Sequence, residues 1–439
     1  MLNGIPPFRI PVEKAQPFRN TASVLQPRTL KSGGLKLSLL KVHAGGSLQP
    51  VLRAKMPELD SLRGIACLMV LVFHGFGNHY TAVGLESIPR TVVQISGYGW
   101  TGVNLFFVLS GFLITGILLN SREERGYYKR FYIRRVLRIL PAYLGVILLL
   151  IGLSSAEMID REVSWSFIGL SLVYLSNLTQ FFGVPLQYGV LWSLAVEEHF
   201  YLLWPTCVKK LNLLGTTIAA GTICILALAC RIAAAKLGYN VFGYETWLVA
   251  DGLGMGALLA IAARAFRQNR MALWRVSGAA AAVAAGCFLI DHIAEHTIAG
   301  GALHVTGINS FYASIVTATI LLGSRFGIRL RGLEFFGDIS YGLYLVHPLC
   351  FDLYDHFSPK FWVAMADGRG NFGVMTFRLL AVSSLAIALA TVSRRFYEER
   401  FLRLKGRLAP LPSEAQGEAP CSSSAHDSVP VAVAAHAAS

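Results

Sequence analysis

The chain has 439 residues, of which 54% are hydrophobic and only 15% are charged, and its formal net charge is +14. Soluble domains carry about 25% charged residues, so this composition argues against an ordinary soluble enzyme. It also excludes a disordered chain, a collagen and a small disulfide scaffold. The seven cysteines are scattered and include no CxxC pair, which indicates buried apolar residues rather than a disulfide framework.

Apolar segments of membrane-spanning length follow one another along most of the chain. A helix needs about 20 apolar residues to cross a hydrocarbon core about 30 Å thick. The sequence therefore predicts an all-α, polytopic membrane protein with about ten transmembrane helices. Their predicted ranges are 60–78, 98–119, 139–154, 190–208, 212–235, 247–263, 276–290, 306–323, 335–357 and 373–393.

Basic residues are distributed unevenly between the loops that join these segments. With the N-terminus in the cytoplasm, the inside segments hold 31 Lys and Arg residues and the outside loops hold 5. Cytoplasmic loops of membrane proteins carry such an excess, so we expect both termini on the cytoplasmic side of a bacterial inner membrane. Topology thus accounts for the positive charge, and a nucleic-acid partner is not expected.

A further apolar stretch, 165–182, does not fit this alternation as an eleventh crossing. Counting it as a span would place Lys209 and Lys210 outside and would invert every later loop. We therefore expect a re-entrant or interfacial segment on the outer side, where protein or water covers its backbone.

The two ends of the chain differ in composition from the apolar part. Residues 1–56 are basic and punctuated by proline, and 406–439 are rich in Ser, Ala and Pro. We expect both to be disordered cytoplasmic tails around a membrane domain of residues 57–405. An alternative for the first tail is that translation starts at Met56, directly before the first span.

The first predicted span carries two ionisable side chains, Arg63 and His74. Such groups are costly at bilayer depth and mark a functional site by default. They are 11 residues apart, almost three helical turns, so both lie on one face about 16 Å apart along the axis. Imidazole can accept and return a proton near neutral pH, which acyl transfer to a hydroxyl requires. The alternative is a snorkelling arginine and a structural histidine bonded to a backbone carbonyl.

The second span and the loop after it add a hydroxyl and two guanidinium groups. Ser110 and Gly111 are small enough to let helices approach closely, and Ser110 fits a packing role or a place in the site. Arg135 and Arg138 share a face at i,i+3 spacing, where the third span begins. Two guanidinium forks at the membrane surface suit the phosphates of a coenzyme A thioester, although topology alone explains most of this charge.

The fourth span contains two neighbouring carboxylates, Glu197 and Glu198, about 15–18 Å into the membrane. Ser193, Glu197 and Tyr201 share one helix face at i,i+4 spacing, and Glu198 points about 100° away from it. One hypothesis is that either carboxylate orients or charges His74. The alternative is that both acids are structural partners of Arg or Tyr side chains.

The ninth span places Ser340, Tyr344 and His347 on one helix face. The proline that follows His347 removes a backbone donor and opens the helix at that point. Tyr344 and His347 are therefore candidate substrate-binding residues, although His347 equally fits a structural role.

Two other patterns carry less weight. Four residues of an outer loop have metal-like spacing but no further ligand, so no metal is expected: Asp291, His292, Glu295 and His296. The alternating glycines at 252, 254 and 256 follow no strand, which favours close helix packing over a nucleotide-binding loop.

Five stretches in order along the chain together resemble the acyltransferase 3 family of integral-membrane acyltransferases. They are Asp60-Ser61-Leu62-Arg63-Gly64 with His74, Val103–Thr115, Arg134–Pro141, Trp192–Pro205 and Ser340–Pro348. The resemblance covers about residues 57–405. It departs from the family's usual residues at Asn104, where Asp is frequent, and at His199, where Gln is usual.

The resemblance implies transfer of an acyl group, usually acetyl, from cytoplasmic acyl-CoA to a carbohydrate or similar acceptor at the far side. Acyl-CoA would be the donor substrate, no bound cofactor is implied, and the other partners would be membrane lipid and a glycan or glycolipid. His74 and Arg63 match the family's essential pair, and Arg135 and Arg138 match its paired arginines. We expect no fused hydrolase-like domain of the kind found in some members.

The hypothesis that follows places the acyl group in a cavity between the first, second, fourth and ninth spans. His74 is then a general base or a transient acyl carrier. A proton-coupled exporter is the alternative, because buried His and Glu residues also suit a proton relay. A non-catalytic membrane scaffold is a third interpretation, and the acceptor and acyl chain length remain open.

Overall fold

The computed structural model describes residues 56–77, 87–293, 298–326, 330–358 and 372–410, and every regular element in these ranges is a helix. The helices in chain order are α1 (Pro57–Val72), η2 (Phe73–Gly77), α2 (Ser87–Gly97), η3 (Tyr98–Thr101), α3 (Gly102–Asn120), α4 (Tyr127–Ser155), α5 (Trp165–Leu172), η4 (Ser176–Phe182), α6 (Leu191–Lys210), α7 (Leu213–Lys236), α8 (Thr246–Val249), α9 (Asp251–Ala265), α10 (Arg270–Ile293), α11 (Ile298–Phe326), α12 (Arg331–Phe357), α14 (Phe372–Val392), η5 (Ser393–Glu398) and α15 (Glu399–Leu408). All of them belong to one unit of the chain, Ser47–Ser439.

Each of the ten predicted spans coincides with a helix or with consecutive helices. In the described part of the chain, seven helical segments are long and apolar enough to cross a membrane. The predicted spans at α6, α9 and α12 are outside this set. The 15 residues of α9 are few for a crossing, and α6 and α12 carry several ionisable side chains that lower their hydropathy. The all-helical, multi-pass architecture is thus confirmed, and the number of ten remains a prediction.

The stretch 165–182 forms the two short helices α5 and η4, joined by a turn in which Tyr174 adopts a positive φ of 57°. With eight residues, α5 is about 12 Å long, too short to cross a bilayer. The segment before α5 is tied to α12 by Arg161, whose guanidinium group donates two hydrogen bonds to Asp352 at 2.9 and 3.1 Å. The stretch is therefore not an eleventh spanning helix, as predicted.

The predicted tails lie almost entirely outside the described residues, which begin at position 56 and end at 410. The last described helix, α15, continues to Leu408 and so includes the first three residues of the predicted second tail. Its end is held to α4, because Arg134 donates a hydrogen bond to the backbone oxygen of Ala409 at 2.8 Å.

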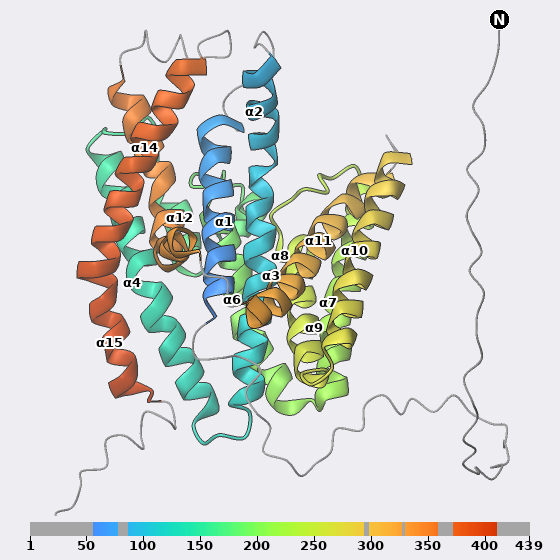
Figure 1. Ribbon diagram of the computed structural model, residues 1–439. Helices are drawn as coiled ribbons and strands as arrows, with labels where there is room; N and C mark the ends of the chain where they lie inside the picture. Colours follow the sequence, from blue (N-terminus) through green and yellow to red (C-terminus); the bar gives the residue numbers. More distant parts are fainter. Residues whose placement is uncertain (1–55, 78–86, 294–297, 327–329, 359–371, 411–439) are drawn as a thin grey trace, which may run out of the picture. The chain divides into compact units, whose positions relative to one another are not determined.

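Small residues allow α1 and α3 to pack closely against their neighbours. A Cβ atom at Gly64 would collide with the backbone of α12, and one at Gly337 would collide with the backbone of α1. Likewise, a Cβ at Gly111 would collide with α9, and one at Gly256 would collide with α3. These contacts confirm the packing role predicted for Gly111 and for the alternating glycines. Figure 1 shows the result, with α1 between α12 and α3.

A fully buried ion pair holds α7, α9 and α11 together. The side chains of Arg231 and Asp251 are both 0% exposed, and Nη2 of Arg231 lies 2.7 Å from the Asp251 carboxylate. The same guanidinium group donates to the backbone oxygen of Ala302 at 3.1 Å and to the hydroxyl of Thr306 at 2.6 Å. Each of these contacts satisfies a polar group that would have no hydrogen-bonding partner in lipid.

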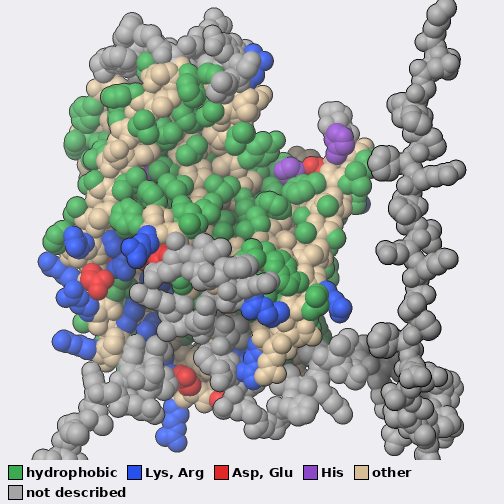
Figure 2. Space-filling view, in the orientation of Figure 1, with side chains coloured by type: hydrophobic (Ala, Val, Ile, Leu, Met, Phe, Trp, Pro, Cys, Tyr) green, Lys and Arg blue, Asp and Glu red, His purple; other side chains and the backbone are tan. Residues whose placement is uncertain are grey.

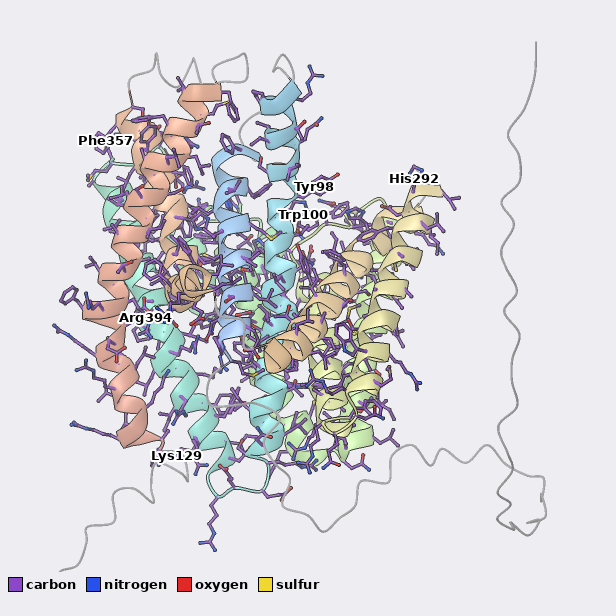
Figure 3. All side chains as sticks on the ribbon, viewed as in Figure 1. Tyr98, Trp100, Lys129, His292, Phe357 and Arg394 are labelled. Atoms are coloured by element: carbon purple, nitrogen blue, oxygen red, sulfur yellow. The ribbon has the colours of Figure 1, made fainter. Side chains whose placement is uncertain are left out.

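Hydrophobic and basic side chains occupy different levels of the molecule. Figure 2 shows a broad band of hydrophobic side chains, with Lys and Arg gathered below it over the lower parts of α4 and α15. Lys129 of α4 and Arg394 of η5 mark this basic end in Figure 3, whereas Tyr98, His292 and Phe357 lie toward the opposite end. The separation is the pattern of a membrane protein with one strongly basic surface.

Replacing Arg231 by Met is expected to lower the unfolding free energy by roughly 3–5 kcal/mol, because Asp251 then stays buried without its counter-charge. Thermal unfolding of the detergent-purified protein measures the loss. Arg403→Met is the matched control, because the Arg403 side chain is 79% exposed and its pair with Glu399 is on the surface. Equal melting temperatures for the two variants would contradict a stabilising role of the buried pair.

Candidate active site

A cavity of about 470 Å³ lies between α1, α3, α4, α6 and α12. These helices correspond to the first four predicted spans and to the ninth. Six of the predicted site residues line the cavity: Arg63, Ser110, Arg135, Arg138, Glu197 and Tyr344. The remaining three, His74, Glu198 and His347, are not part of its lining. Apolar side chains from α3, such as Phe106, Phe107 and Leu113, form much of the remaining wall.

Three guanidinium groups reach the cavity from two helices. Arg63 is 20% exposed and lies 3.8 Å from the carboxylate of Asp60, one turn earlier on α1. Arg135 is half-buried, and its guanidinium carbon lies 5.1 Å from the centre of the Tyr201 ring. Arg138, at the next turn of α4, is exposed. The i,i+3 spacing therefore directs both arginines of α4 to one cavity, and stacking on an aromatic ring limits the movement of Arg135.

Two hydrogen bonds join the helices around the cavity. The hydroxyl of Ser110 in α3 donates to Oε1 of Glu197 in α6 at 2.6 Å. The hydroxyl groups of Ser193 in α6 and Tyr344 in α12 lie 2.6 Å apart. Ser193, Glu197 and Tyr201 all line the cavity, as expected for residues that share one helix face. Ser110 thus binds a carboxylate in addition to permitting close packing.

His74 lies against a second histidine. Its Nδ1 atom is 3.2 Å from Nε2 of His347, and the two ring centres are 4.8 Å apart. The Tyr344 ring, which faces the cavity, is centred 5.9 Å from that of His347. The histidine pair therefore begins one side chain beyond the cavity wall.

Glu197 and His74 each contact a side chain of another helix, and the orientation of His74 by a glutamate remains a prediction. The carboxylate of Glu197 is bonded to Ser110, and the side chain placed against His74 is His347. Glu198 is half-buried, in electrostatic range of Glu197 and Arg135. Periodicity along α6 predicts which face Glu197 occupies, but it cannot predict which helix faces that side.

His74 is carried by a local change of helix type. Residues Phe73–Gly77 form the π-helix η2, a geometry that often occurs at functional sites. Arg378 of α14 donates to the backbone oxygen of Gly75 at 3.4 Å and to the carboxylate of Asp355 in α12 at 2.7 Å. No motif of the sequence pointed to Arg378 as a site residue. Its position inside an apolar span was the only signal that could have pointed to it.

The two residues that depart from the family's usual pattern, Asn104 and His199, have neighbours outside the cavity. Asn104 donates to Asn309 of α11 at 2.8 Å, and the His199 ring lies 2.6 Å from the hydroxyl of Thr246. Both contacts join helices, which gives these residues a structural role here.

The candidate metal ligands are only partly described, and Asp291 and His292 lie in the last turn of α10 instead of in the predicted loop. Asp291 accepts a hydrogen bond from His304 at 2.7 Å, whereas Glu295 and His296 lie outside the described residues. Among the residues that the structure describes, no group of three or more His, Cys, Asp or Glu side chains could hold a metal ion.

Comparison with known proteins identifies an acyltransferase-domain family, acyltransferase 3, that matches residues 56–393. YrhL of Bacillus subtilis, provisionally named a peptidoglycan O-acetyltransferase, is 30% identical over 326 residues, which cover 66% of this chain and 48% of YrhL. The peptidoglycan O-acetyltransferase OatA of Listeria monocytogenes is 34% identical over 165 residues, which cover 35% of this chain and 24% of OatA.

A third relative, SAS0844 of Staphylococcus aureus, is provisionally named an O-acetyltransferase. It is 27% identical over 381 residues, which cover 79% of this chain and 57% of SAS0844. The chain thus spans about half the length of YrhL and SAS0844. No solved structure matches it significantly.

Proposed function

The chain belongs to the acyltransferase 3 family, and we propose that it transfers an acetyl group from acyl-CoA to a hydroxyl of a cell-surface glycan. The observation that carries the proposal is the cavity, which has guanidinium groups on its wall and an imidazole pair one side chain beyond it. Phosphate binding and proton transfer are the two tasks that such a reaction requires. The multi-pass helical architecture supports a site within the membrane domain.

The charge and the size of the cavity support acyl-CoA as the donor. Arg135 and Arg138 would bind the phosphates of acyl-CoA at the basic end of the molecule, with Arg63 beside them. The cavity volume of about 470 Å³ is within the usual range of small-molecule sites. Its apolar wall from α3 suits the thioester end of the donor, which carries no charge.

The chemical step needs a base for the acceptor hydroxyl. In the direct route, His74 removes the hydroxyl proton while the oxygen attacks the thioester carbonyl. The new C–O bond forms, the C–S bond breaks, and the proton passes from the imidazole to the departing thiolate sulfur. In the two-step route, the imidazole of His74 attacks the thioester carbonyl, so that a C–N bond forms, the C–S bond breaks and the thiolate leaves. The acceptor oxygen then takes the acetyl group as the C–N bond breaks, and its proton passes to the released imidazole.

The acceptor class is inferred from the relatives. Two of them are named peptidoglycan O-acetyltransferases, one provisionally, which supports a glycan of the cell surface as acceptor. A proton-coupled exporter, the alternative drawn from the sequence, finds no support among these relatives. Labelled acetyl-CoA tests both interpretations, because an enzyme transfers the label to the acceptor glycan and an exporter does not.

We further propose that the basic end faces the cytoplasm, with both termini on that side and the α5–η4 segment on the outer side. The excess of Lys and Arg at the lower ends of α4 and α15 supports this orientation. Acyl-CoA would then enter from the compartment in which it is made.

His74→Ala is expected to lower acetyl transfer by a factor of about 10²–10⁴, because the acceptor hydroxyl loses its base. The measurement is incorporation of labelled acetyl into the glycan by detergent-purified protein. His304→Ala is the matched control, because His304 is bonded to Asp291 and does not line the cavity. Full activity of His74→Ala would rule out the proposed role of this imidazole.

Arg135→Gln and Arg138→Gln are each expected to raise the KM for acetyl-CoA by a factor of about 10–100, with a small change in kcat. The loss of one charge-assisted hydrogen bond to a phosphate weakens binding by about this factor. Acetyl-pantetheine, which lacks the nucleotide phosphates, should show no such penalty. Arg130→Gln is the control on the same helix, because Arg130 pairs with Glu124 outside the cavity lining. An equal KM increase with acetyl-pantetheine would exclude phosphate binding by these arginines.

The orientation can be tested with single cysteines introduced into a variant that lacks the native ones. Glu162→Cys, three residues before α5, should react in intact cells with a maleimide that cannot cross the inner membrane. Lys129→Cys and Lys210→Cys should react only after the membrane is made permeable. All three positions are exposed, so burial would not limit their reaction. Labelling of Lys210→Cys in intact cells would invert the proposed topology.

A further inference from the structure

We infer that His347 is a positioning residue that holds the proton of His74 on Nδ1 and so leaves the lone pair of the neutral ring on Nε2. The inference rests on the proposed function, because it says which nitrogen of His74 removes the acceptor proton. The sequence pattern placed His347 among substrate-binding residues, whereas its neighbours in the structure are the His74 ring, the Tyr344 ring and a backbone carbonyl.

A backbone carbonyl group determines which nitrogen of His347 carries the proton. Nδ1 of His347 lies 3.0 Å from the backbone oxygen of Leu343, one turn earlier on α12. A carbonyl oxygen can only accept a hydrogen bond, so Nδ1 of His347 carries a proton. In a neutral imidazole the other nitrogen then holds a lone pair. Nε2 of His347 is therefore an acceptor.

That acceptor faces Nδ1 of His74 at 3.2 Å. The same nitrogen of His74 lies 2.9 Å from the backbone oxygen of Val70. Two acceptors thus converge on Nδ1 of His74, and a lone pair on this nitrogen would face both of them. The arrangement favours the tautomer with the proton on Nδ1, which leaves the lone pair of His74 on Nε2.

Burial favours the neutral form of His347 in this arrangement. Its side chain is 1% exposed, and none of its contacts with the described residues is a carboxylate. A buried imidazolium without a counter-charge is costly, so Nε2 of His347 is better suited to accept than to donate. When His74 takes the acceptor proton, its Nδ1–H bond to His347 becomes charge-assisted and therefore stronger.

The position of His347 is itself constrained from the cavity side. The Tyr344 ring packs beside it, and the hydroxyl of Tyr344 is bonded to Ser193 of α6 at 2.6 Å. The helix face of Ser340, Tyr344 and His347 thus connects the cavity wall to the His74 ring. A side chain that replaces His347 must reproduce both its volume and its acceptor to keep His74 oriented.

The test compares His347→Gln, which keeps an acceptor oxygen near the former Nε2 position, with His347→Leu, which fills similar space without one. In purified full-length protein, His347→Leu should lower kcat at least about tenfold with little change in the KM for acetyl-CoA, the effect of losing one charge-assisted bond. His347→Gln should recover most of the wild-type kcat. His304→Leu should resemble the wild type.

A second measurement does not depend on activity. Nitrogen NMR of protein labelled in its histidines distinguishes the two tautomers, and His74→Gln identifies the His74 signals. In the wild type, His74 should carry its proton on Nδ1, and His347→Leu should increase the Nε2–H tautomer. A wild-type His74 protonated on Nε2 would overturn the inference, as would equal kcat values for the Gln and Leu variants. If His74→Ala retains full activity, the proposed base fails, and the tautomer measurement still decides whether His347 orients this ring.

Discussion

A polar side chain inside a bilayer must find its partners within the protein, and this constraint organises the structure of this chain. Arg231 is satisfied by Asp251 of α9 and by two groups of α11, so that it forms a fully buried connection between three helices. Arg378 meets Asp355 and the backbone of Gly75 in the same way. These satisfied groups fix the positions of helices whose remaining faces can then carry the site.

The candidate site differs from these ion pairs because its charged side chains face a cavity. Arg135 stacks on Tyr201 and Arg138 is exposed, so both guanidinium groups remain able to bind a polyanion that enters from the basic end. The imidazoles of His74 and His347 lie deeper, beyond the Tyr344 side chain. The two tasks of the proposed reaction are therefore separated along α1, with the phosphate-binding groups at one end and the proton-transferring groups at the other.

Close contact between helices explains why this separation is maintained. Glycines at 64 and 337 bring the backbones of α1 and α12 together; α12 supplies His347, and η2, which continues α1, supplies His74. A histidine pair at 3.2 Å requires such proximity, because neither ring has a flexible stem long enough to bridge a wider gap. The π-helical turn at Phe73–Gly77 and its contact with Arg378 then define the direction of the His74 ring.

The sequence by itself determined the membrane class, the places of the ten predicted helices and the helix faces of Arg135, Arg138 and Glu197. These properties depend on hydropathy and on the period of 3.6 residues, which are local features of the chain. The tertiary structure alone decided that Ser110 is a partner of Glu197 and that His347 faces His74. Periodicity shows which face a residue occupies, but its partner depends on which helix packs against that face, and that is set by contacts between segments far apart in the sequence.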